Sequence, residues 1–409
     1  ASSCRFRRVS SAKPMGTAER IGQHLGTRQQ AMVSLLESLV RMESPSDVAA
    51  TQAPVLDLLQ QSLEELDFRT IRLPVRQFGG HLYAAPRGGR CTGDTRRWQL
   101  LLGHCDTVWP VGTLQTMPLQ RDGDVLRGPG VYDMKAGLVE MIFALEGLRE
   151  LDLRPAVQPI VFINSDEELG SRESTRYIKA LSRCADRALV MEPSLGVHGK
   201  LKTARKGVGR FTITIRGKAA HAGLDPTAGA SAILELSHVI QKLFALNDPE
   251  RGASVNVGVI DGGVRANVVA PESSAVVDVR VLSHEDATRI EQEILSLRAE
   301  TPGVNLTVAG RIGRPPLEHT LSNRQLWRVA TGIARNLDLD LDEGTAGGGS
   351  DGNTTSLYTA TLDGLGAVGD GAHADHEHIQ VSRLPERCAL LAMLLLAPSL
   401  QDAAVEADA

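Results

Sequence analysis

The chain has few aromatic residues, few cysteines and no long apolar run. Only 3% of its 409 residues are Phe, Trp or Tyr, so its cores have to be built mainly from Leu, Val, Ile and Ala. The five cysteines are never spaced as Cys-x-x-Cys, which argues against a disulfide framework and against a thiolate zinc site. The longest apolar stretch, 389–396, is far shorter than the roughly 20 residues of a membrane span. We therefore expect a reducing, cytoplasmic location and no membrane partner.

The chain also lacks a strong excess of charge of either sign. Its formal net charge of −5 offers no electrostatic reason to expect nucleic acid as a partner. The first 18 residues hold four basic residues and no acid, but no apolar run follows, so the segment is not a secretory signal as written. It resembles an organelle transit peptide, and the alternative is a disordered extension upstream of a start at Met15. We expect a disordered leader over residues 1–28.

Apolar runs and helical patterns alternate through the first half of the chain. The apolar runs at 98–103, 160–164 and 187–191 predict strands that are buried on both faces. Apolar residues with helical spacing predict helices over 30–40 and 136–151. Strands that alternate with helices form a mostly parallel sheet flanked by helices, so we predict an α/β fold.

The pattern changes near residue 207 to one of alternating, half-exposed strands. Strands are expected at 211–215, 254–260, 275–282 and 304–308, with helices at 228–246 and 285–299. This βαββαβ order is that of a ferredoxin-like sandwich. Helical patterns return near 323–337 and 384–396. We therefore predict that residues 207–315 form a second domain inserted into a first domain made of residues 29–206 and 316–409.

A histidine and an aspartate end the first apolar run, in Leu-Gly-His104-Cys-Asp106-Thr. Residues i and i+2 of an extended chain point the same way, so His104 and Asp106 share a face. A carboxylate beside an imidazole suits a metal ligand that is oriented by an acceptor. An ordinary polar pair is the alternative, so this motif alone decides little.

Further acids stand where strands end or a helix begins. Asp133 falls at the start of the 136–151 helix, where it could cap the helix, bind metal or do both. Glu167 and Glu168 close a buried strand, at the edge where α/β sheets place their ligands, although a solvated acidic turn is the alternative. Of two adjacent glutamates, one can bind a metal while the other acts as a general base.

The last two candidate motifs are Glu192, directly after the third apolar run, and a polar loop that holds His373, His376 and His378. A histidine cluster is as often an adventitious metal binder as a catalytic one. Together with the acids, however, the histidines form the ligand set that a pair of zinc ions prefers. The combination predicts a site for two zinc ions, with cobalt or manganese as alternative metals.

The order of these motifs is similar to that of a known family. The chain contains GHCDTV, GPGVYDMKAG, SDEELGS, MEP and a late GAH, in this order. They resemble the di-zinc exopeptidases, which include glutamate carboxypeptidase (carboxypeptidase G), aminoacylase, acetylornithine deacetylase and succinyl-diaminopimelate desuccinylase. The resemblance covers nearly the whole chain from about residue 30, and it is closest for glutamate carboxypeptidase.

The resemblance implies a role for each residue of the predicted site. The metal ligands would be His104, Asp133, Glu168, Glu192 and His373, with Asp133 shared by both zinc ions. Asp106 would hold the imidazole of His104. Glu167 would be the general base that activates a water for attack on the amide carbonyl and then passes its proton to the leaving amine.

The resemblance also implies that the inserted domain, residues 207–315, is a lid and dimerisation domain and that the rest of the chain from residue 29 is the zinc catalytic domain. His221 would donate a hydrogen bond to the scissile carbonyl oxygen from the partner subunit of a homodimer that forms through the lid. A histidine in a surface turn is the alternative. Asn267 and Arg314 would contact a carboxylate of the substrate, and Arg280 could do the same or pair with an acid in the sheet.

Two further features have open interpretations. Gly348 and Gly349 belong to a Gly-rich loop that would let backbone N–H groups approach a carboxylate, or that is an ordinary tight loop. Cys105 and Trp109 depart from the family pattern, and no role follows from either.

The resemblance implies a zinc-dependent amide hydrolase. The first hypothesis is a glutamate-type carboxypeptidase that releases a C-terminal amino acid from a small peptide or an N-acyl conjugate. The second is an N-acyl-amino-acid deacylase or a dipeptidase with the same two-zinc site. The third is an inactive relative that only binds, but all the expected ligands and the presumed base are present.

Overall fold

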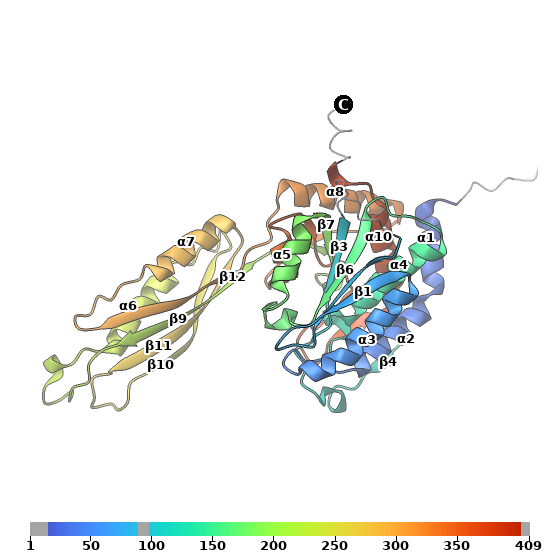
Figure 1. Ribbon diagram of the computed structural model, residues 1–409. Helices are drawn as coiled ribbons and strands as arrows, with labels where there is room; N and C mark the ends of the chain where they lie inside the picture. The colour runs from blue at the N-terminus through green and yellow to red at the C-terminus, as the bar shows by residue number, and fades with distance from the viewer. Residues whose placement is uncertain (1–14, 89–97, 402–409) are drawn as a thin grey trace, which may run out of the picture.

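A computed structural model of the chain describes residues 15–88 and 98–401, and the larger of its two lobes is built around a mixed β-sheet (Figure 1). The described strands of this sheet follow the order β1-β2-β6-β3-β7-β14. Their bounds are β1 Phe68–Leu73, β2 His81–Pro86, β3 Trp98–His104, β6 Gln158–Asn164, β7 Ala185–Val190 and β14 Ala360–Leu362. β6, β3, β7 and β14 run parallel, whereas β1 and β2 pair antiparallel at one edge. The predicted mostly parallel sheet is confirmed.

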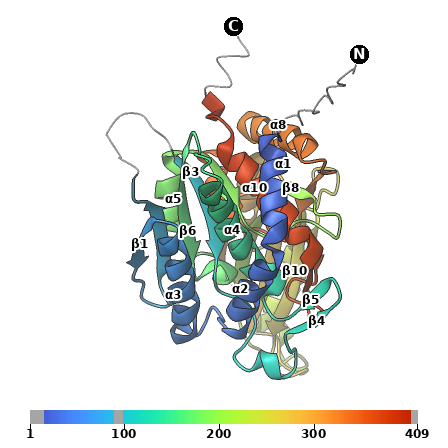
Figure 2. The same ribbon diagram turned by 90° about the vertical axis from the view of Figure 1, so that its right-hand side faces the viewer.

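Helices cover both faces of this sheet, and Figure 2 shows α1, α2 and α4 on one side of it. The helices of this lobe are α1 Thr17–Thr27, α2 Gln29–Arg41, α3 Ala49–Glu65, α4 Ala136–Glu150, α5 Thr175–Arg183, α8 Leu321–Asn336, α9 Asp351–Thr355 and α10 Leu384–Leu396. Successive strand residues point to opposite faces, so Leu101 packs into the core with α4 and α10, and Leu100 into the core with α5. Across the described ranges, none of the helices has the length and apolar character that a bilayer span requires.

The start of the described chain corrects the expected leader. Residues 17–27 form α1, in which Ile21 and Leu25 are fully buried. Residues four apart lie on the same face of a helix, so these two side chains anchor α1 to the core beside α10. Two apolar positions in a polar segment are too weak a periodic signal to reveal the helix. Residues 1–14 of the expected leader lie outside the described residues.

The smaller lobe, on the left in Figure 1, is a four-stranded antiparallel sheet with two helices. Its elements are β9 Gly207–Arg216, α6 Ala232–Phe244, β10 Ser254–Gly262, β11 Glu272–Val281, α7 His284–Leu295 and β12 Asn305–Arg314. The spatial order β10-β11-β9-β12 is that of a ferredoxin-like sandwich, as the βαββαβ pattern predicts. Phe211, Ile213 and Ile215 point to its buried face, which the period-two pattern also predicts. The domain limits at residues 207 and 315 stay a prediction.

Two small sheets bring distant segments of the larger lobe together. One has the order β15-β16-β5-β4, and the other joins β8 to β13. Their bounds are β4 Gln120–Asp122, β5 Val125–Arg127, β8 Leu201–Arg205, β13 Glu343–Ala346, β15 Gly369–Asp370 and β16 His378–Gln380. The pairing of β16 with β5 places the loop that holds His373 beside the segment that holds Asp133.

Candidate active site

Three neighbouring strands carry candidate ligands to one edge of the central sheet. His104 is the last residue of β3, Glu167 and Glu168 follow β6, and Glu192 follows β7. β6, β3 and β7 are parallel neighbours, so their carboxyl ends meet at the same edge. The side chains that follow these three strands therefore converge.

The converging atoms form two groups that share Asp133. His104 Nε2 lies 3.4 Å from Asp133 Oδ1 and 3.4 Å from Glu192 Oε1. His373 Nε2 lies 3.4 Å from Asp133 Oδ2 and 3.2 Å from Glu168 Oε2. The two carboxylate oxygens of Asp133 thus face different imidazoles.

The tautomer of His104 follows from its second ring nitrogen. Nδ1 lies 3.0 Å from the backbone oxygen of Asp106, which can only accept, so Nδ1 carries the proton. In the neutral ring the lone pair is then on Nε2, and it points at carboxylate oxygens that also can only accept. Either a bound metal ion or a second proton on the ring resolves this conflict; although burial opposes it, the carboxylates of Asp106, Asp133 and Glu192 raise the pKa of His104.

Several of these buried atoms have no conventional partner. His104 Nε2, Asp133 Oδ1 and Glu168 Oε1 find no hydrogen-bond partner within the part of the chain that the structure describes. Tetrahedral zinc, with ligands at about 2.0–2.1 Å, places neighbouring ligand atoms about 3.3–3.4 Å apart. The 3.2–3.4 Å separations in both groups fit that geometry. The residues therefore fit a pair of bound metal ions.

Asp106 is fully buried, and its carboxylate is bound mainly by groups other than His104. It accepts hydrogen bonds from Ser46 Oγ at 2.7 Å and from the backbone N–H groups of Glu167 and Glu168 at 3.2 and 3.1 Å. Its Oδ1 lies 3.4 Å from His104 Nδ1. Asp106 therefore orients the Glu167–Glu168 turn as well as the imidazole.

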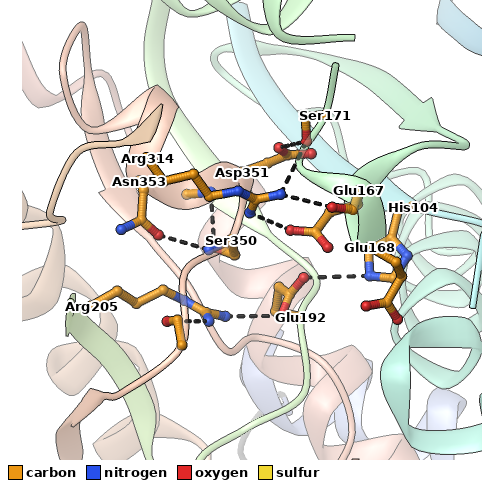
Figure 3. Close-up of polar contacts among 12 residues, drawn as sticks. His104, Glu167, Glu168, Ser171, Glu192, Arg205, Arg314, Ser350, Asp351 and Asn353 are labelled. Atoms are coloured by element: carbon orange, nitrogen blue, oxygen red, sulfur yellow. Dashed lines mark hydrogen bonds and ion pairs between the residues drawn. The ribbon is translucent and has the colours of Figure 1, made fainter. Parts of the chain in front are cut away.

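Glu167, the expected base, contacts Arg314 at the end of β12 (Figure 3). Arg314 Nη1 lies 2.5 Å from Glu167 Oε1, and Nη2 donates to the backbone oxygen of Glu167 at 2.7 Å. Burial raises the pKa of the Glu167 carboxyl to about 8, although the positive charge of Arg314 opposes this shift. Burial also raises the pKa of Glu168, to about 7, against the opposing effect of His373.

Glu192 has the opposite electrostatic environment. Arg205, the last residue of β8, donates from Nη2 to Glu192 Oε2 at 2.9 Å and binds both oxygens of Asp363 at 2.7 and 2.9 Å (Figure 3). Burial disfavours the Glu192 carboxylate, but the charge of Arg205, together with the contacts of His104 and Lys202, outweighs burial and lowers the Glu192 pKa to about 2. Glu192 is thus ionised, and Arg205 holds one of its two oxygens.

The structure distinguishes between alternatives that the sequence left open for the histidine loop and for Asp133. His376 and His378 are exposed or half-buried and contact their own loop, whereas His373 faces Asp133 and Glu168. The capping alternative for Asp133 is wrong, because no side chain among the described residues caps the first turn of α4. The metal-binding roles themselves stay predictions.

The lid residues are placed away from this cluster. His221 Nδ1 accepts from the backbone N–H groups of Gly223 and Leu224, both at 3.1 Å, and none of the described metal-site residues bonds to it. Asn267 is exposed beside it, and its backbone oxygen accepts from Ala222 N–H at 3.0 Å. The structure brings neither residue to the metal cluster of the same chain.

Arg280 also lies on the lid, in β11. Its guanidinium binds Asp278 with two hydrogen bonds of 2.8 and 3.0 Å, so it has the acidic partner in the sheet that was one of its two interpretations. Its proposed contact with the substrate would have to replace this pair.

The Gly-rich loop approaches the site from β13. The Gly348 oxygen accepts from Arg205 Nη1 at 3.2 Å, and a Cβ at Gly349 would lie 3.1 Å from Arg314 Cδ. The letters of this loop also form Gly-x-Ser-x-Gly around Ser350. Ser350 caps α9, and its hydroxyl donates to Asp363 Oδ2 at 2.5 Å. Since no imidazole among the described residues contacts it, Ser350 is a helix cap and not an activated nucleophile.

Sequence reasoning missed Ser46 and Arg205. Neither lies in one of the recognised motifs, and Arg205 reaches Glu192 across 13 positions and Asp363 across 158. The one local signal is that Arg205 ends an apolar-polar strand just before the lid, which by itself indicates nothing about a carboxylate partner.

Comparisons with known proteins agree with this arrangement. Residues 203–305 match the peptidase dimerisation domain of the M20 family. The chain is 28% identical to carboxypeptidase G2 of Pseudomonas sp. (strain RS-16) over 378 residues, which cover 90% of this chain and 89% of that protein.

Solved structures share the fold. The aminopeptidase PepT from Bacillus cereus ATCC 10987 superimposes with a TM-score of 0.73 and 22% identity, over 90% of this chain and 98% of that one. The YXEP protein of Bacillus subtilis, a dinuclear metal binding peptidase from the M20 family, gives a TM-score of 0.66 and 14% identity over 91% and 98%. The resemblance predicted from the motifs is confirmed by these similarities to M20 peptidases, which indicate that the chain is a hydrolase of amide bonds.

Proposed function

We propose that the chain is a two-zinc carboxypeptidase that releases a C-terminal amino acid, of the glutamate type, from a small peptide or an N-acyl conjugate. The observation that carries the proposal is the pair of ligand groups that share Asp133. Beside them lies Glu167, a buried glutamate that is not in the ion pairs of His104 or His373. The similarity to carboxypeptidase G2 over 90% of the chain supports the choice of reaction.

The metal ligands divide between the two groups. His104, Asp133 and Glu192 would hold one zinc ion, and His373, Asp133 and Glu168 the other. Zinc would polarise the scissile carbonyl and lower the pKa of the attacking water. The dinuclear metal site of the YXEP protein, which has the same fold, supports two metals here.

Glu167 is the group that moves the proton. Arg314 contacts its Oε1, so we assign proton transfer to Oε2. Glu167 accepts a proton from the attacking water and delivers it to the nitrogen of the leaving amine. Asp106 keeps the turn in place, because it accepts from the backbone N–H groups of both Glu167 and Glu168.

Arg314 and the Gly-rich loop border the side of the site on which we place the substrate carboxylate. Arg314 is 16% exposed, and its planar guanidinium can bind a carboxylate with two parallel hydrogen bonds. Gly348 is exposed, and nothing lies within 4 Å of where its Cβ would be, so a ligand could approach its backbone. An enzyme with this recognition would need a free carboxylate next to the scissile amide.

Dimerisation through the lid would complete the site. β10 is an edge strand of the lid sheet, and Val259 and Ile260 on it are 60% and 62% exposed. In His221, Nδ1 accepts two backbone N–H groups, so the neutral ring carries its proton on Nε2 and can donate outward. We assign His221 and Asn267 to the active site of the partner subunit, where His221 donates to the carbonyl oxygen.

A substrate panel tests the reaction. Zinc-loaded protein is given acyl-glutamates, acetylated amino acids and dipeptides, and the release of free glutamate is scored against the release of acetate. Glutamate release from acyl-glutamates supports the proposal. Failure to cleave any acyl-glutamate, together with acetate release from acetylated amino acids, would replace it with the deacylase alternative.

The dimer is tested separately. We expect twice the chain mass in solution, and complementation of activity when a His221→Ala chain is mixed with a Glu167→Gln chain, because mixed dimers regain one complete site. A monomeric mass with full activity would refute the assignment of His221 to the partner's site.

A further inference from the structure

One carboxylate outside the ligand set binds the backbone that carries Asp133. Glu377 is fully buried and accepts hydrogen bonds on both oxygens. Its Oε1 accepts from the backbone N–H groups of Tyr132 at 2.9 Å and Asp133 at 3.0 Å. Its Oε2 accepts from Gly130 N–H at 2.9 Å and from the indole Nε1 of Trp109 at 2.7 Å.

Glu377 belongs to the same loop as His373, four residues earlier. His373 has φ +63°, in the left-handed region that costs energy for a residue other than glycine, so its loop needs outside support to keep this shape. Inside the loop, Ala374 N–H donates to Gly371 O and Glu377 N–H to Ala374 O, at 2.8 and 3.0 Å. The Glu377 carboxylate then joins this loop to the Asp133 segment.

Trp109 adds a third segment to the same junction. It follows β3, which ends at His104, by five positions. Its indole donates to Glu377 across 268 positions of the chain. One carboxylate therefore links the segments that carry His104, Asp133 and His373, and this contact gives Trp109 a role that its departure from the family motif did not indicate.

We infer that Glu377, completed by Trp109, is a positioning residue for the second metal site, the one formed by His373, Asp133 and Glu168. The inference rests on the proposed two-metal function. Glu377 sets the distance between the His373 and Asp133 segments, so its loss weakens the second site, which needs both segments, more than the first site of His104, Asp133 and Glu192, which does not include His373.

The donor pattern makes Glu377→Gln an informative change. All four partners of the side chain are N–H donors, and a carboxylate offers an acceptor oxygen to each. A glutamine keeps one oxygen, and its NH₂ group would face two donors. The size and shape of the side chain stay the same, so the change affects these hydrogen bonds and little else.

The test is a titration of metal-free full-length protein with Co²⁺, followed by visible absorption and by calorimetry. His373→Ala identifies the binding step of the second site. The test variants are Glu377→Gln and Trp109→Phe. Trp98→Phe is the matched control, because Trp98 is at the opposite end of β3 and its indole donates to Leu181 O at 3.1 Å.

We expect Glu377→Gln to lower the affinity of the second site roughly 10- to 100-fold, as the loss of partners outside the ligand shell does elsewhere, and the first site less. Trp109→Phe loses one hydrogen bond, so we expect about a 2- to 10-fold loss at the second site. Trp98→Phe should bind two Co²⁺ ions like the parent.

Unchanged second-site affinity in Glu377→Gln, or equal losses at both sites, would overturn the inference. If Glu377→Gln does not fold, the same comparison of Co²⁺ affinity at the two sites is made with Trp109→Phe, and the same outcomes would overturn the inference. A parent chain that binds fewer than two Co²⁺ ions would instead contradict the proposed function. The two failures are therefore distinguishable.

Discussion

Replacement of Arg205 by methionine tests how the site holds its negative charge. Arg205 is 3% exposed, and its guanidinium binds one oxygen of Glu192 and both oxygens of Asp363. Methionine keeps the length and the apolar stem of the side chain but has no donor. The Arg205→Met variant therefore leaves two buried carboxylates without their shared cation, while Ser350 Oγ still donates to Asp363.

The magnitude follows from the burial of the partners. Removal of one member of a buried ion pair costs about 3–5 kcal/mol, because the remaining charge is uncompensated. Glu192 and Asp363 are 7% and 0% exposed, so we expect a loss in this range from the free energy of unfolding of the metal-free chain. Neutralising Asp363 as well removes one of the two orphaned charges. Arg205→Met with Asp363→Asn should then be less destabilised than the sum of the single variants.

The assay is urea unfolding of metal-free protein, followed by far-UV circular dichroism, for the parent, both single variants and the double variant. Arg187→Met is a control, since Arg187 is a fully buried arginine that donates to Gln99 and to backbone oxygens near the C-terminal end of α10. The Arg187→Met variant should be less stable than the parent but bind Co²⁺ with unchanged affinity, whereas Arg205→Met should lose both stability and Co²⁺ affinity. A loss below about 1 kcal/mol in Arg205→Met, or strict additivity in the double variant, would refute the reasoning.

Three further predictions concern the base, the metals and a buried acid. Glu167→Gln should lower kcat roughly 10²- to 10⁴-fold while two Zn²⁺ ions per chain stay bound, and a variant as active as the parent would rule out Glu167 as the base. EDTA should abolish hydrolysis and Zn²⁺ restore it, because the buried carboxylates need the cations; activity that survives complete metal removal contradicts this. Burial raises the pKa of Glu140, whose oxygens have no hydrogen-bond partner in the described ranges, so the folded chain keeps a proton that the unfolded chain releases above about pH 4.3. The stability of the parent relative to Glu140→Gln should therefore fall as pH rises above that value. Urea titrations at several pH values measure the difference in unfolding free energy between the two proteins, and a difference that does not vary with pH would contradict the prediction.

Local patterns predicted most of the elements that position the site. The apolar runs became β3, β6 and β7, and the Leu-rich stretch 384–396 became α10. These segments are buried on all sides, so their composition alone identifies them. α1 and α3 were missed, since a short or mixed apolar stripe gives a weak periodic signal.

The candidate ligands were found for a topological reason. Residues that follow parallel strands meet at one edge, so His104, Glu168 and Glu192 could be grouped before any distance was known. His373 needed the resemblance to a family, because three histidines of one polar loop look alike in the sequence. Its contacts with Asp133 and Glu168 then distinguish it from His376 and His378.

The sequence by itself determined which residues are candidates for metal binding, and its similarity to M20 peptidases indicates amide hydrolysis. Only the tertiary structure decided what holds those residues: Arg205 on Glu192, Arg314 on Glu167, and Glu377 with Trp109 on the Asp133 segment. The physical reason is range. A ligand's type and its place after a strand are local properties, whereas these supporting hydrogen bonds join residues 13 to 268 positions apart and exist only once the elements have packed.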